Sequence, residues 1–128
     1  MNTALFNKEL PSFIKEQLKE VGLSTPIRFV DEHNNEMVPY SQLITYAYAF
    51  DFLFKKGYLI SVSKNYDLAE ECFSGAYDWS VDGSTTEDSD AGWVADTWFE
   101  AANEAILKAI ELIQKLCMIY TAKWLIRP

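Results

Sequence analysis

The sequence predicts one α+β domain, with an antiparallel three-stranded meander packed against helices. Helical periodicity appears near both ends of the chain, and short alternating apolar segments lie between. The chain has 128 residues, of which 49% are apolar, so it can bury a core without metals or disulfides. We therefore expect residues 1–128 to form a single domain with the element order α-β-β-α-β-β-β-α.

An amphipathic N-terminal helix is predicted first, followed by a short hairpin. The apolar residues of the helix recur at steps of three and four: Leu10, Phe13, Ile14, Leu18 and Val21. Pro11 suits the first helical turn, and Gly22 suits the position just after the helix. Residues 27–32 and 36–38 then flank His33-Asn34-Asn35, a group that favours a turn, so we expect His33 at the solvated tip of a hairpin.

A second helix is predicted from Ser41, a favourable N-cap, to Lys56, where Gly57 provides a stop. Most residues of this helix are aromatic or aliphatic, which leaves a narrower polar strip than a surface helix normally has. The helix is therefore either central in the core or partly covered by a partner, including a second copy. We favour the core, because aromatic residues at helical spacing usually pack inside a protein.

Three strands are expected next, at Tyr58–Ser63, Ala76–Val81 and Gly92–Ala95. The connection Asp82–Asp90 is polar throughout, which predicts a mobile loop. Its acids do not follow the spacing of oxygen ligands in a calcium-binding loop, so we expect no ion there.

The last helix has the clearest start signal, because Thr97 and Glu100 form a capping box. Its apolar stripe contains Ala102, Ile106, Ala109, Ile113 and Leu116. The opposite stripe is polar and places Glu104 one turn before Lys108, an order that favours an ion pair.

The tail, residues 118–128, is too apolar to be an idle end. Three alternatives stay open: the tail extends the helix, adds an edge strand, or binds a partner or a second copy. Trp124 would belong to an exposed apolar patch if the tail is not docked.

Charge is unevenly spread along the chain, whose net charge is -8. Residues 66–104 contain eleven acidic residues and no Lys or Arg, whereas the rest holds eleven basic and eight acidic residues, a net charge of +3. Nucleic-acid binding is therefore disfavoured, because affinity for phosphates depends largely on Lys and Arg.

The sequence supports no metal or cofactor site. Cys72 and Cys117 are 45 positions apart, and His33 is the single histidine. We expect both cysteines to be reduced thiols that line the core. Common phosphate, dinucleotide, metalloprotease and nucleophile-elbow motifs are missing, so no catalytic residue is assigned and a non-enzymatic role is favoured. A small hydrolase that uses paired carboxylates stays an alternative.

No run approaches the roughly 20 apolar residues of a membrane-spanning helix, and the start of the chain lacks a basic-then-apolar signal pattern. These features predict a cytoplasmic protein.

Two segments carry a resemblance to small uncharacterised phage and mobile-element proteins of gut Bacteroidetes. Val38–Gln42 opens the aromatic helix as a Pro-Thr-Gln-like start does in those proteins, and Asp96–Ala101 is similar to their capping-box junction. The similarity spans most of residues 10–117 and implies a phage or mobile-element origin with the same element order.

A narrower span, Tyr58–Leu116, also resembles HicB-type antitoxins, in which a meander and a following helix share a similar junction. That resemblance implies a protein that neutralises a basic partner through its acidic half. The DNA-binding appendage usual in that family is not recognisable here.

The favoured hypothesis is an accessory protein that acts through protein contacts, since an acidic surface steers encounter with a basic partner. The alternative is an acidic surface that only keeps the protein soluble. The candidate partner-binding residues are Asp82, Glu87, Asp88, Asp90, Trp93 and Trp124.

Overall fold

The predicted α+β class and element order are confirmed, with a short helix and a 3-10 turn added. The computed structural model describes residues 3–24, 29–30, 32–37 and 44–126, with side chains described over 5–24, 32–35 and 44–116. Its elements are α1 (Thr3–Phe6), α2 (Ser12–Glu20), β1 (Phe29–Val30), β2 (Glu36–Met37), α3 (Tyr46–Lys55), β3 (Leu59–Asp67), β4 (Cys72–Asp82), η2 (Thr86–Asp88), β5 (Asp90–Ala95) and α4 (Trp98–Ile126).

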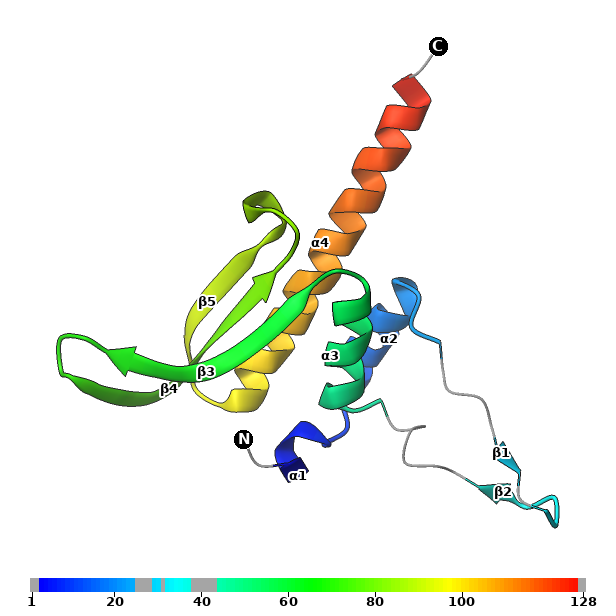
Figure 1. The fold of residues 1–128 in the computed structure, drawn as a ribbon, viewed down its shortest axis with the longest axis horizontal. Coiled ribbons are helices and arrows are strands. Elements are labelled where there is room, and N and C mark those ends of the chain that lie inside the picture. The colour runs from blue at the N-terminus through cyan, green and yellow to red at the C-terminus, as the bar shows by residue number, and fades with distance from the viewer. Residues whose placement is uncertain (1–2, 25–28, 31, 38–43, 127–128) are drawn as a thin grey trace.

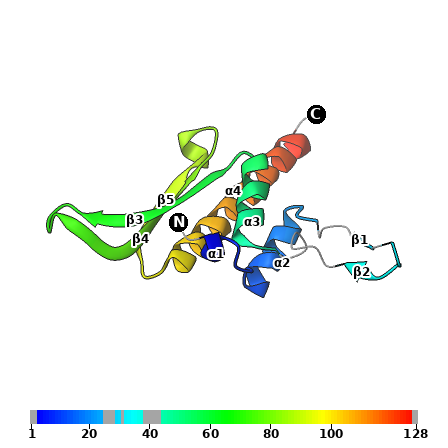
Figure 2. The same ribbon diagram turned by 60° about the horizontal axis from the view of Figure 1, so that its bottom comes forward.

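The elements form three layers with α4 in the middle. β3, β4 and β5 make an antiparallel sheet in the order β3-β4-β5, as the meander predicts. One face of this sheet packs on α4, and α2 and α3 lie against the other side of α4 (Figures 1 and 2). The β1-β2 hairpin lies away from these layers, with the exposed His33 in its turn as expected.

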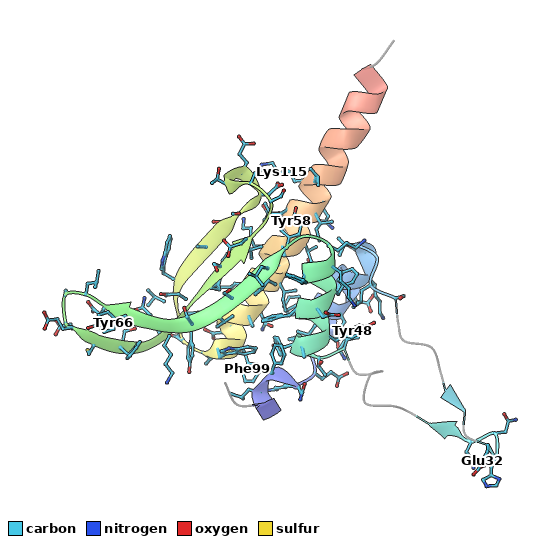
Figure 3. All side chains as sticks on the ribbon, in the orientation of Figure 1. Glu32, Tyr48, Tyr58, Tyr66, Phe99 and Lys115 are labelled. Carbon is cyan, nitrogen blue, oxygen red and sulfur yellow. The ribbon has the colours of Figure 1, made fainter. Side chains whose placement is uncertain are left out.

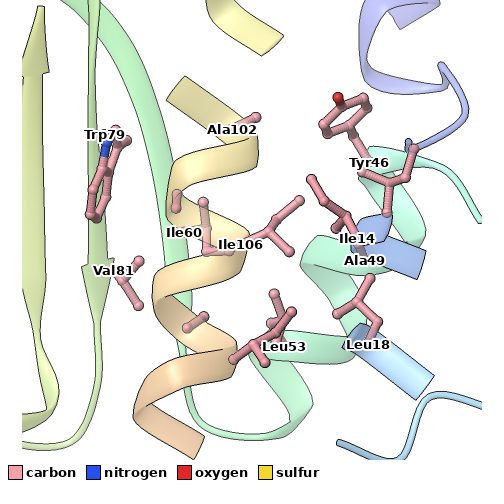
Figure 4. Packing of buried hydrophobic residues seen from close by; sticks show 14 of the residues in the cluster. Ile14, Leu18, Tyr46, Ala49, Leu53, Ile60, Trp79, Val81, Ala102 and Ile106 are labelled. Carbon is pink, nitrogen blue, oxygen red and sulfur yellow. The ribbon is translucent and has the colours of Figure 1, made fainter. Parts of the chain in front are cut away.

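The core lies on both sides of α4 (Figure 4). Small residues let the helix approach its neighbours closely: Ala101, Ala102, Ala105 and Ala109 are fully buried. Trp79 and Val81 face α4 from the sheet, while Leu18 and Leu53 face it from α2 and α3. This packing agrees with the core interpretation of the aromatic helix, although Phe54 remains 60% exposed.

The predicted start of the aromatic helix is wrong. Ser41 lies outside the described residues, and α3 begins at Tyr46 with Thr45 as its N-cap, whose hydroxyl accepts a hydrogen bond from Tyr48 N at 3.2 Å. Thr45 is extended because it forms a β-bridge with Glu9, a contact between distant segments that the local pattern does not reveal. Gly22 and Gly57 follow their helices with positive φ, as predicted.

All three strands of the meander are longer than the sequence predicts, β3 and β4 by more than β5. β3 and β4 continue as a hairpin beyond the part of the sheet that covers α4, and this hairpin projects from the body in Figure 1. Cys72 lies in the projecting part and is exposed, so the prediction that it lines the core is wrong. The side chain of Cys117 lies outside the described residues.

The tail extends the last helix, since α4 continues to Ile126. The predicted inward stripe weakens at its end, where Leu116 is 39% exposed because the sheet no longer covers the helix. The expected pairing of Glu104 with Lys108 is also wrong, since Lys108 contacts Asp90 and Glu111. None of the helices in the described part of the chain combines the length and apolarity needed to cross a membrane.

Candidate interaction surface

The connection between β4 and β5 brings four predicted acids to one end of the sheet. Asp82 ends β4, Glu87 and Asp88 lie in η2, and Asp90 opens β5. Here the sequence predicted a mobile loop, but the structure shows a hydrogen-bonded turn. The hydroxyl of Thr85 accepts from Asp88 N at 3.3 Å.

Lys108 of α4 neutralises part of this charge. Its Nζ lies 3.3 Å from Asp90 and 3.2 Å from Glu111. The backbone N–H of Ala91 and then the Lys108 ammonium hold the pKa of Asp90 below its ordinary value. The Glu111 and Asp90 carboxylates raise the pKa of Lys108. Within the part of the chain whose side chains are described, Lys108 is the one cation that forms an ion pair with residues 66–104, while Lys8 Nζ lies over the Phe99 ring, 4.3 Å from its centroid. The segregation of charge therefore persists in part.

Trp93 and Val94 form the most exposed apolar pair of the sheet edge. Trp93 is 72% exposed and Val94 is 63% exposed. Tyr77 pairs with Ala95 and Trp79 with Gly92, so Asp78 between them lies opposite both Trp93 and Val94 in a β-bulge.

The bulge is held by a carboxylate and is strained. Asp78 Oδ1 accepts a hydrogen bond from Val94 N at 3.2 Å, and the amide of Asn65 donates to the same carboxylate at 2.9 Å. Val94 has a φ of 63°, which a β-branched residue rarely adopts. Such strain persists only where the surroundings enforce it, and it is commoner at functional sites than elsewhere.

The acids continue past the bulge into the first turn of α4. Glu100 N donates to the Thr97 hydroxyl at 3.1 Å, as the capping box predicts, but the Glu100 carboxylate accepts from Asp96 N rather than from Thr97 N. Both Asp96 and Glu100 are exposed. We call the surface formed by these residues and the β4–β5 turn the acidic edge: Asp82, Glu87, Asp88, Asp90, Trp93, Val94, Asp96 and Glu100.

The sequence analysis did not predict an apolar cluster on the projecting hairpin. Its prediction for Trp124 stays untested. Tyr66, labelled in Figure 3, and Phe73 pair across the projecting hairpin with ring centroids 5.3 Å apart, and Leu68 at its turn is 83% exposed. Aromatic residues on both sides of a turn that contains Glu70 and Glu71 were the available signal. Trp124 lies in α4, but its side chain is outside the described residues.

The described residues contain neither a cluster of metal ligands nor a buried pair of carboxylates. No group of three His, Cys, Asp or Glu among them is placed to hold a metal ion. Among the described residues, Thr45 is the buried polar residue and no carboxylate is buried. The buried acid pair that the hydrolase alternative requires is therefore not found in this part of the chain.

No family model matches this chain, and no curated protein or solved structure matches it either. The resemblances to phage proteins and HicB-type antitoxins therefore stay predictions, and the proposals below rest on the geometry of the acidic edge.

Proposed function

We propose that this protein is a non-enzymatic accessory protein, of phage or mobile-element type, that binds a basic protein partner along its acidic edge. The observation that carries the proposal is the bulge in β5, where Asp78 holds Val94 in a strained conformation and Trp93 is 72% exposed. Tryptophan is enriched among the residues that dominate protein–protein binding energy. An exposed tryptophan on a rigid strand suits that role better than one on a loose loop.

Acids on both sides of the tryptophan favour a basic partner. Asp90 precedes it on β5, and Asp96 and Glu100 follow at the start of α4. Carboxylates around an apolar contact accelerate encounter with a positively charged surface and disfavour acidic competitors. The sheet order also leaves β5 at an edge, where no described strand pairs with its outer side.

Affinity capture from host lysate tests the proposal. The immobilised protein should retain a basic protein at about 50 mM salt and release much of it at about 300 mM, because exposed charges are screened over that range. Trp93→Ala should remove most of the bound protein. Asp82→Lys combined with Glu87→Lys should lower capture at low salt without unfolding the chain.

A matched control separates a specific surface from net charge. Glu16→Lys combined with Glu20→Lys changes the total charge equally, but both residues lie exposed on α2, away from the acidic edge. This control should bind as the unmodified protein does. Equal loss in both double variants, or no salt-sensitive protein at all, would overturn the proposal.

A further inference from the structure

The last helix is longer than the body that it supports. α4 has 29 residues, which corresponds to about 44 Å at 1.5 Å per residue. In Figures 1 and 2 its C-terminal turns extend beyond the sheet and the other helices. Burial falls in the same direction, from Ile106 and Ile110, at 0% and 1% exposed, to Leu116 at 39%.

The C-terminal turns of α4 stay apolar beyond the point where the sheet and the other helices cover the helix. Ten of the fourteen residues in 113–126 are apolar, and apolar residues continue at the three- and four-residue steps that packed the earlier turns. A helix in water normally presents a broad polar face, so a helical segment this apolar favours burial against another surface.

The charge of the C-terminal turns of α4 indicates which surface would cover them. After Glu111 the chain has no acid, and it carries Lys115, Lys123 and Arg127. The opposite end of α4 is acidic, with Asp96 and Glu100 exposed beside Trp93 and Val94. One chain therefore contains a basic apolar helix end and an acidic edge with exposed apolar side chains.

The two ends cannot meet within one molecule. β5 ends at Ala95 and α4 starts at Trp98, so the acidic end of the edge lies at the first turn of the helix. Ile113 is fifteen residues further along the same continuous helix, about 22 Å away at 1.5 Å per residue. The β4–β5 turn already lies beside Lys108 of the same helix, so only the end of the acidic edge with Trp93, Asp96 and Glu100 must come from another molecule.

We propose that residues 113–126 dock on the end of the acidic edge that holds Trp93, Asp96 and Glu100 in a second copy, with the two α4 helices antiparallel. In this arrangement each basic end lies beside the Trp93 and Asp96 of the other copy. The exchange is reciprocal, so it closes into a twofold dimer rather than an open chain. An anionic membrane surface is the other occupant that a basic apolar helix fits, but the net charge of -8 opposes adsorption of the whole protein.

Light scattering of the full chain during size-exclusion chromatography tests the dimer. We expect a mass of twice 14.7 kDa at low salt, falling toward the monomer as salt rises. Lys123→Glu should lower the dimer affinity at least tenfold, and so should Asp96→Lys, because each places like charges together at both contacts. Lys55→Glu, at an exposed position on α3, is the matched charge control and should leave the dimer intact.

A charge swap makes the test specific. Mixing the Lys123→Glu chain with the Asp96→Lys chain should restore a dimer, since one contact then has exchanged charges and the other is native. A monomeric full chain, a dimer indifferent to both reversals, or no recovery on mixing would overturn the inference. Binding of a monomeric chain to vesicles rich in phosphatidylserine would assign the helix end to a membrane surface instead.

This inference uses the surface of the proposed function but does not require a foreign partner. Salt-sensitive capture of a host protein by a monomeric chain would overturn the dimer and leave the proposed function standing. A dimer that captures no host protein would support the dimer and overturn the proposed function.

Discussion

The indole N–H of Trp79 donates a hydrogen bond to the Glu104 carboxylate at 2.8 Å, which links the central strand of the sheet to the central helix. Trp79 is 8% exposed, so its ring is part of the core while its polar atom is satisfied. The ring also lies directly beside Gly92 of β5, the strand that carries the acidic edge.

Gly92→Ala should destabilise the fold. A Cβ at this position would lie 2.7 Å from Trp79 Cζ2 and closer still to the indole nitrogen, so the ring or the strand must move. Overpacking of this kind costs about 1–3 kcal/mol. Urea unfolding measures the loss, with Ser80→Ala on the neighbouring strand as a control that should change stability by less than about 0.5 kcal/mol. A Gly92→Ala protein as stable as the original would contradict the packing described here.

Glu104→Ala should cost more than Glu104→Gln. Alanine leaves the part-buried Trp79 N–H without its acceptor, which costs about 1–3 kcal/mol, whereas glutamine keeps a carbonyl oxygen at the same distance along the side chain. Denaturant unfolding of both variants checks this order. Glu111→Ala, at an exposed position further along α4 whose surface ion pair with Lys108 is worth at most about 1 kcal/mol, serves as a control for lost charge and helix propensity. Equal stability of the alanine and glutamine variants would show that the hydrogen bond between Trp79 and Glu104 does not stabilise the fold.

The elements that the sequence predicts well are those whose signals are local. Thr97 and Glu100 identify the start of α4 because both partners of the cap lie within one turn. The start of α3 depends instead on Thr45 meeting Glu9, 36 positions earlier in the chain, so its local signals point to the wrong residue.

The candidate surface also has features that local sequence predicts and features that depend on contacts between distant residues. Its acids are visible in the sequence as a segment without Lys or Arg. The exposure of Trp93 beside a strained Val94 depends on the register of β4 and β5 and on the carboxylate of Asp78, 16 positions from Val94. The neutralising role of Lys108 likewise requires α4 to lie beside the start of β5.

Val94→Gly should stabilise the protein. Glycine adopts a positive φ without the penalty of about 1–2 kcal/mol that an L side chain meets there, and Val94 is 63% exposed, so little packing is lost. We expect a gain of about 0.5–1 kcal/mol in the free energy of unfolding. The control is Ala91→Gly on the same strand, at a residue without positive φ, which should lose stability. A loss in both variants would show that Val94 is not strained.

Asp90→Asn should remove part of the acid sensitivity of the fold. The folded pKa of Asp90 is lowered, so its contribution to stability is present above the ordinary carboxyl pKa and is lost as pH falls through the lowered value. Because 46% of the side chain is exposed, the contribution should be below about 1 kcal/mol. Unfolding free energies of the two proteins should differ most near neutral pH and converge below about pH 4. A difference that stays constant down to pH 2 would contradict this assignment.

Tyr46→Phe should destabilise the protein near neutral pH and do so less at alkaline pH. Near neutral pH the variant loses the 2.7 Å hydrogen bond from the Tyr46 hydroxyl to Asn103 Oδ1, worth about 0.5–1.5 kcal/mol. Burial raises the pKa of Tyr46 above 10.0, against a smaller lowering by the Asn103 bond. Its stabilising effect is therefore complete below about pH 10 and is lost as pH rises through the raised value. Ultraviolet difference titration should show that a tyrosine ionising above the ordinary pKa is missing from the variant. If the variant loses no such step, Tyr46 does not have the raised pKa, and the contact between α3 and α4 is weaker than its geometry indicates.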